Sequence, residues 1–137
     1  ALAQELLRRY PSNRILVYPD ASGSARSTIN ASKTDIAILE SYGFSSMALK
    51  SNPFIKDRVA TVNALLQNGK GERRLAIHAS CTRLIQCLEL QSYDEKTGDP
   101  DKQNGYDHMN DALGYLIYRE FNLLYGRAGK RTGIRIY

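Results

Sequence analysis

The sequence predicts an α/β fold in which parallel strands alternate with helices. Apolar, β-prone stretches recur between segments with helical periodicity, in the order helix, strand, helix, strand, helix, strand, helix, helix. The stretch RILVYP at 14–19 is apolar almost throughout, which is typical of a parallel strand buried on both faces. We therefore expect parallel strands flanked by helices.

The N-terminal part predicts two helices, and a strand follows the second one. Residues 1–10 are amphipathic and resemble the end of a helix. The segment SKTDIAILESYG at 32–43 begins with the cap-forming Ser32 and ends on Gly43, as helices commonly do. FSSMALKS at 44–51 then predicts a second strand.

The rest of the chain predicts three helices, one strand and a loop. We expect helices over 53–69, over 81–93 and from Asp107 onward, and a strand at 73–80. The segment 94–105 has turn formers and charges without periodicity, so we expect a loop there. The apolar stripes expected to be buried are Ile55, Val59, Val62 and Leu66; Cys81, Ile85 and Leu88; and Met109, Ala112, Leu113, Leu116 and Ile117.

Length and composition fit one globular domain. We expect it to span 1–125 and to be followed by a basic tail at 126–137, which either contacts DNA or a partner or is disordered. The net charge of +5 favours a polyanionic partner. No run approaches the roughly 18 apolar residues of a membrane span. Cys81 and Cys87 lie six residues apart on different helix faces, so we expect reduced thiols and a cytosolic location.

Asp20 follows the first predicted strand directly. Ligand sites in parallel sheets lie beyond the carboxyl ends of the strands, and the same geometry places Lys50 and residues 78–80 along that edge. A carboxylate there suits a metal ligand or an acid–base group. The Asp-x-Ser-Gly sequence is equally good turn chemistry, so both interpretations stay open at this point.

Asp107 and Asp111 form a second acidic feature. They lie four residues apart in GYDHMNDALGY, so on a helix both carboxylates face the same way and repel each other. A divalent cation shared with Asp20 would relieve that repulsion, because Mg²⁺ and Mn²⁺ prefer carboxylate oxygens. The alternative is that Asp107 caps the helix and Asp111 is solvated.

Together, these features resemble the C-terminal nuclease domain of the large terminase subunits that package DNA in tailed bacteriophages and herpesviruses. The resemblance rests on VYPDASG at 17–23, LKSNPFIKDRVATVNALL at 49–66 and the segment LIQCLELQSYDEKTGDPDKQNGYDHMNDALGYLIY at 84–118. It implies an RNase H-like fold. It also implies a nuclease in which three acidic residues bind two Mg²⁺ or Mn²⁺ ions and cut concatemeric double-stranded DNA by two-metal phosphodiester hydrolysis.

By position, Asp20 matches the second acidic ligand of that family, and Asp107 or Asp111 matches the third. Family members open with three antiparallel strands, the first of which carries the first catalytic aspartate. Nothing before residue 14 resembles these strands, so we expect a fragment of the domain with doubtful activity of its own. The resemblance further implies an ATPase domain, a small terminase subunit and a portal as partners, and the host cell cytoplasm as location.

Several charged residues near these motifs are candidate contacts. Lys50, Lys56 and Arg58 are expected to contact the DNA backbone or else to be solvated helix charges. His108 lies between the two acids and is a candidate for tuning the metal site from outside the ligand set. His78 is expected to be a packed core or edge residue.

Two other functions remain as alternatives. Another RNase H-like nuclease, such as a junction resolvase or transposase, would share the acidic residues and differ in its DNA substrate. A receiver-like signalling domain would be phosphorylated on Asp20 and would contact the phosphate through Lys50. That second alternative leaves the two acids of the last helix unexplained.

Overall fold

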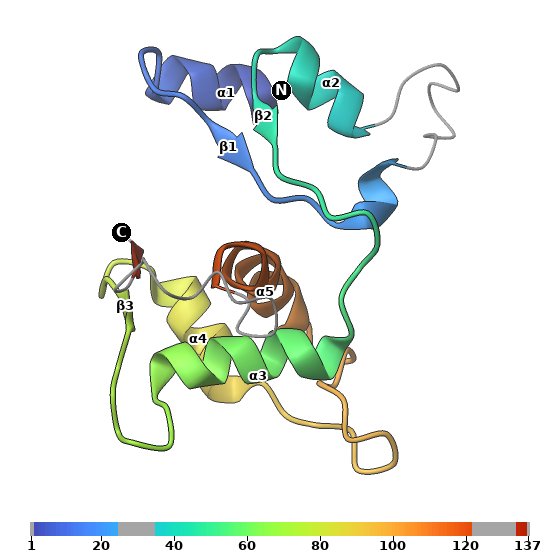
Figure 1. Ribbon diagram of the computed structural model, residues 1–137, viewed down its shortest axis with the longest axis vertical. Coiled ribbons are helices and arrows are strands. Elements are labelled where there is room, and N and C mark those ends of the chain that lie inside the picture. The colour runs from blue at the N-terminus through green and yellow to red at the C-terminus, as the bar shows by residue number, and fades with distance from the viewer. Residues whose placement is uncertain (1, 25–34, 122–133, 137) are drawn as a thin grey trace. The chain divides into compact units, whose positions relative to one another are not determined.

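The computed structural model describes residues 2–24, 35–121 and 134–136 (Figure 1). Its elements confirm the expected order of helices and strands and add a strand at the C-terminal end. They are α1 (Leu2–Arg9), β1 (Leu16–Val17), the 3₁₀ turn η1 (Ala21–Ser24), α2 (Asp35–Ser41), β2 (Ser45–Ser46), α3 (Ile55–Leu66), β3 (Leu75–Ile77), α4 (Thr82–Leu90), α5 (Asp107–Phe121) and β4 (Ile134–Ile136). The chain divides into two compact units, residues 1–52 and residues 53–137.

Unit 1 (residues 1–52) contains a parallel strand pair next to helices. Strand β1 pairs with β2 so that Leu16 lies opposite Ser45. Helix α2 is followed by Gly43, whose φ of 85° is the left-handed conformation that commonly ends a helix and that glycine adopts without strain. The parallel pairing of β1 with β2 confirms the predicted α/β class. Ser32, the expected cap of the second helix, lies outside the described residues.

The expected burial of the first strand on both faces is wrong. Leu16 is 42% exposed, and Val17 is only partly buried. The regular strand is two residues long and is paired only with β2 among the residues that the structure describes. Such a short strand pair does not bury Leu16 on both faces.

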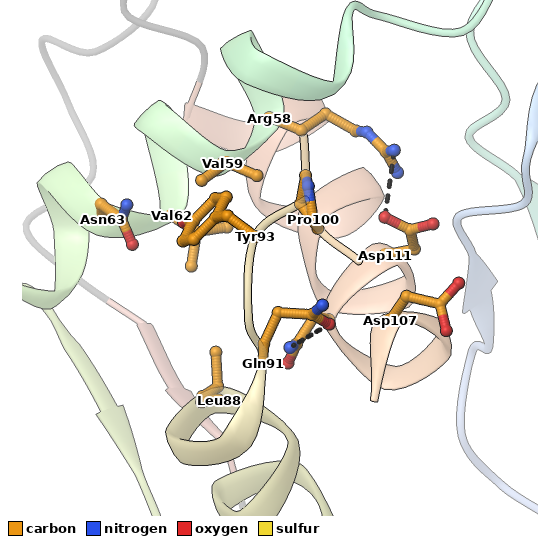
Figure 2. Close-up of a pocket in the computed structure, with 12 residues that line it drawn as sticks. Arg58, Val59, Val62, Asn63, Leu88, Gln91, Tyr93, Pro100, Asp107 and Asp111 are labelled. Atoms are coloured by element: carbon orange, nitrogen blue, oxygen red, sulfur yellow. Dashed lines mark hydrogen bonds and ion pairs between the residues drawn. The ribbon is translucent and has the colours of Figure 1, made fainter. Parts of the chain in front are cut away.

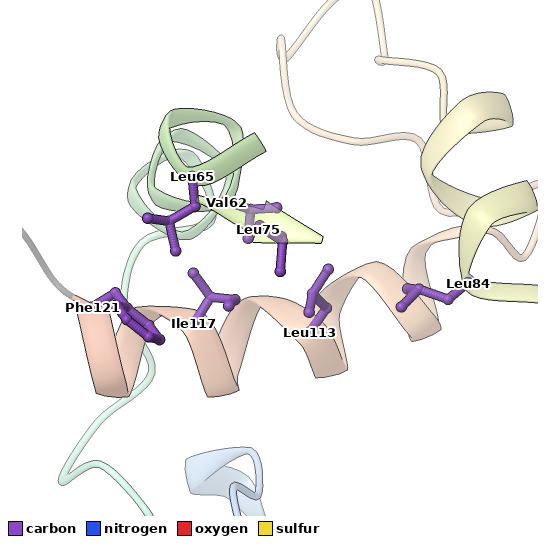
Figure 3. Packing of buried hydrophobic residues seen from close by; sticks show 7 residues of the cluster. All are labelled: Val62, Leu65, Leu75, Leu84, Leu113, Ile117 and Phe121. Atoms are coloured by element: carbon purple, nitrogen blue, oxygen red, sulfur yellow. The ribbon is translucent and has the colours of Figure 1, made fainter. Parts of the chain in front are cut away.

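Unit 2 (residues 53–137) has a core built where α5 packs on α3. Val62 and Leu65 of α3 face Leu113, Ile117 and Phe121 of α5 (Figure 3). Leu75 of β3 and Leu84 of α4 complete the cluster. Ile117 is fully buried, and Leu65 is 2% exposed. This packing fixes the position of α5, the helix that carries both acids.

The expected stripes are confirmed in part: Val62, Leu113 and Ile117 are buried in the core, and Leu66, Cys81 and Leu88 pack against it. Helix α3 buries Arg58, Thr61, Val62 and Leu65; α4 buries Leu84 and Cys87; and α5 buries Asp107, Leu113, Gly114, Ile117, Tyr118 and Phe121. Met109 is 40% exposed and Ala112 is also exposed, contrary to expectation. The buried face of α3 also includes Arg58, which lies outside the expected stripe and has its ion-pair partner Asp111 on α5.

Residues 134–136, expected to belong to an irregular tail, form β4. This strand pairs in parallel with β3, with Leu75 opposite Ile134 and Ile77 opposite Ile136. The other residues of the predicted tail lie outside the described ranges. His78 follows β3 and is exposed rather than packed in the core, because the chain turns there and its Nδ1 lies 2.8 Å from Ser80 Oγ.

The loop expected at 94–105 is present and has well-defined turns. Asp94 Oδ1 accepts hydrogen bonds from the backbone amides of Thr97 and Lys96, which lower the pKa of this carboxyl below its ordinary value. A bridge between Tyr93 and Pro100 closes the loop. Both cysteines are free thiols, as expected, and Cys87 is completely buried.

Candidate functional site

Asp20 lies immediately beyond β1, in the turn that leads into η1. Its Oδ1 accepts a hydrogen bond from the Ser22 amide and another from Asn52 Nδ2, each 2.7 Å long. Asn52 Oδ1 in turn accepts from the Ala21 amide at 2.9 Å. The bond from Ser22 is the turn chemistry that the sequence indicates. The sequence does not indicate the bond from Asn52, because this donor lies far along the chain, in the segment beyond β2.

Asp107 is the first residue of α5 and is only 5% exposed. Its Oδ1 is buried and has no hydrogen-bond partner among the described residues. Its Oδ2 lies 3.8 Å from Nδ1 of His108, whose side chain is 86% exposed. A buried carboxylate oxygen without a donor is costly, unless a ligand supplies the missing interaction.

Asp111, one turn further along α5, has a different environment. Arg58 Nη2 lies 3.0 Å from its Oδ1, and the guanidinium is 4.3 Å from the centre of the Tyr115 ring. Arg58 is 5% exposed, and its stem lies beside Gly114, where an added Cβ would meet Arg58 carbons at the ordinary contact distances of 3.6–3.7 Å. Arg58 therefore neutralises Asp111 and joins α3 to α5.

A pocket of about 160 Å³ adjoins these residues within unit 2. Figure 2 shows the carboxylates of Asp107 and Asp111 on the same side of α5, with Arg58 reaching Asp111 from α3. The apolar part of the lining includes Val59, Val62, Leu88 and Pro100. Two carboxylates therefore line a partly apolar pocket: Asp111, which is paired with Arg58, and Asp107, which is not.

The three candidate DNA contacts lie in unlike environments. Lys50 and Lys56 are exposed, and Lys56 Nζ lies 5.9 Å from the centre of the Phe54 ring. Arg58 is neither an exposed backbone contact nor a solvated charge, because it is buried and paired with Asp111. Neither lysine forms an ion pair within the described part of the chain that a contact with a phosphate backbone would break. Arg58 cannot make such a contact without leaving Asp111.

The candidate acids belong to different units: Asp20 lies in unit 1, and Asp107 and Asp111 lie in unit 2. Within the ranges that the structure covers, no group of three or more His, Cys, Asp or Glu side chains could hold a metal ion. The expected convergence of the three carboxylates therefore stays a prediction.

Asn52 and Gly114, which lie next to the candidate residues Asp20 and Arg58, were not expected from the sequence. The sequence signals for them were the position of Asn52 beyond a predicted strand and the presence of a glycine at 114 inside a helix.

Comparison with known families identifies the class of this domain. The family model described as the terminase RNaseH-like domain matches residues 1–120, which is most of the chain. The chain belongs to this family of terminase RNase H-like nuclease domains. Searches of curated proteins and of solved structures gave no match. Among the described residues, no helix is long and apolar enough to cross a membrane. The family favours the terminase interpretation over the resolvase, transposase and receiver-like alternatives.

Proposed function

We propose that this domain is a divalent-metal-dependent endodeoxyribonuclease that cuts concatemeric double-stranded DNA during viral genome packaging. Asp20 and Asp107 are its metal-ligating carboxylates in this chain. Membership of the terminase family supports the class of reaction. The unpartnered, buried Oδ1 of Asp107 is the observation that carries the assignment of the site.

The donor chemistry fits Mg²⁺ or Mn²⁺. Both ions take carboxylate oxygens and retain some of their waters. Asp107 offers an oxygen that is removed from bulk solvent and that accepts no hydrogen bond from the residues the structure describes, which leaves it available to a ligand. When bound, such ions supply an activated water and stabilise charge at the leaving oxygen of a phosphodiester. The task of Asp20 and Asp107 is to hold them in place.

Asp107, and not Asp111, is the ligand on α5 in this proposal. Arg58 already compensates the charge of Asp111 at 3.0 Å, so recruiting Asp111 to a metal would leave a buried guanidinium without its partner. Asp111 and Arg58 instead fix α5 against α3. His108 lies beside Asp107 and adjusts the local charge from the solvent side.

Lys50 and Lys56 contact the DNA backbone in this proposal. Both are exposed, so their charges are available to phosphates, and such contacts carry no sequence preference. Arg58 is excluded from this role by its burial. In the packaging motor, the domain works with an ATPase domain, a small terminase subunit and the portal, in the host cell cytoplasm.

Titration of the chain with Mn²⁺, followed by calorimetry, tests the assignment. We expect Asp107→Asn to weaken Mn²⁺ binding at least about tenfold, because it removes a charged ligand. Asp111→Asn is the matched control on the same helix. It should change Mn²⁺ affinity less than about threefold, and lower the free energy of unfolding by about 2 kcal/mol, because Arg58 loses its partner. A larger loss of affinity in Asp111→Asn than in Asp107→Asn would reverse the assignment.

A further inference from the structure

We propose that Asn52 is a positioning residue that holds the carboxylate of Asp20 in the orientation needed to bind a divalent cation. This inference rests on the proposed function, because it assumes that Asp20 is a metal ligand. Asn52 itself touches no metal and no substrate in the proposal.

The geometry is a two-point contact between Asn52 and the start of the turn. Asn52 Nδ2 donates to Asp20 Oδ1 at 2.7 Å, and Asn52 Oδ1 accepts from the Ala21 amide at 2.9 Å. The primary amide carries both a donor and an acceptor, and both are used on adjacent residues. One side chain therefore fixes both the backbone of the turn and the carboxylate that it presents.

The hydrogen bonds between Asn52 and the turn at Asp20 connect two segments that are distant in the sequence. Asp20 follows β1, and Asn52 lies beyond β2, the strand paired with β1 in parallel. The contact therefore ties together two segments that leave the same edge of the strand pair. Without it, Asp20 Oδ1 would keep the Ser22 amide, a local donor only two residues away.

Two donors on one oxygen restrict the carboxylate more than one donor does. The Ser22 amide and Asn52 Nδ2 approach Asp20 Oδ1 from different parts of the chain, so rotation of the side chain breaks at least one bond. A ligand that is already oriented loses less conformational entropy on binding the ion. Removal of such an outer contact typically weakens metal binding 10- to 100-fold.

The test is a Mn²⁺ titration of the full chain by NMR, read from the paramagnetic broadening of the Ala21 and Ser22 amide signals. We expect Asn52→Ala to shift the midpoint of this broadening to about tenfold higher Mn²⁺. Asn52→Gln keeps the amide and should fall between Asn52→Ala and the original chain. Asn68→Ala is the matched control, because Asn68 also holds a turn through both ends of its amide, but in unit 2.

The outcomes separate this inference from the proposed function. An unchanged midpoint in Asn52→Ala, with normal broadening in the original chain, overturns the positioning role and leaves Asp20 as a ligand. Absence of broadening at Ala21 and Ser22 in the original chain overturns both. If Asn52→Ala is unfolded by circular dichroism, Asn52→Gln decides: a midpoint equal to that of the original chain contradicts the positioning role.

Discussion

Arg58 carries a positive charge into the interior of unit 2, where Asp111 is its ion-pair partner and Tyr115 is its stacking partner. Its Nε and Nη1 have no hydrogen-bond partner in the described part of the chain, so the pair is only partly compensated. Such a pair adds little stability by itself but is costly to break on one side. The sequence could place Asp107 and Asp111 on one helix face from their spacing. It could not show which acid has an arginine partner, because that partner comes from another helix.

A double-mutant cycle at the residue scale tests this pair. We expect Arg58→Ala and Asp111→Asn each to lower the free energy of unfolding in urea, with a coupling energy of about 1–2 kcal/mol. The exposed pair of Arg8 and Glu5 is the matched control, and solvent screening should make its coupling much smaller. Additive effects of Arg58→Ala and Asp111→Asn would contradict the ion pair.

At the scale of elements, the contact of α3 with α5 determines where the candidate ligand lies. The predicted start of α5 at Asp107 is confirmed, because the apolar periodicity of the helix is a local signal. The burial of Arg58 on α3 was not predictable, because the apolar pattern of a helix assigns an arginine to the solvent-facing side. Strand β4 was missed for a similar reason: its partner β3 is distant in the sequence, and a three-residue strand leaves almost no pattern.

Gly114→Ala tests the spacing of these two helices. An added Cβ would meet Arg58 carbons at ordinary van der Waals distances, and alanine favours a helix over glycine by about 1 kcal/mol. We therefore expect the free energy of unfolding to rise by about 0.5–1 kcal/mol in urea denaturation. Gly105→Ala is the control, and it should destabilise the chain because Gly105 has a φ of 72°. Destabilisation by Gly114→Ala would contradict this spacing, because it would mean that Arg58 on α3 lies closer to Gly114 than ordinary van der Waals contact with an added Cβ allows.

At the scale of the whole molecule, the class of fold followed from alternation of helices and strands, and the family followed from three sequence blocks. The match over residues 1–120 confirms that family. The proposed roles of Asp20, Asp107 and Asn52 depend on the surroundings of these side chains, which composition and spacing do not encode. Two observations came only from the structure: the Asp107 oxygen that has no hydrogen-bond donor among the described residues, and the hydrogen bond from Asn52 to Asp20.

The most direct test of the proposed site is to soak crystals of the chain in Mn²⁺ and locate the ion by its anomalous scattering. We expect peaks within ligand distance, about 2.0–2.6 Å, of carboxylate oxygens of Asp20 and Asp107, with Arg58 still paired to Asp111. Peaks at neither carboxylate, or a peak at Asp111 with Arg58 displaced, would contradict it.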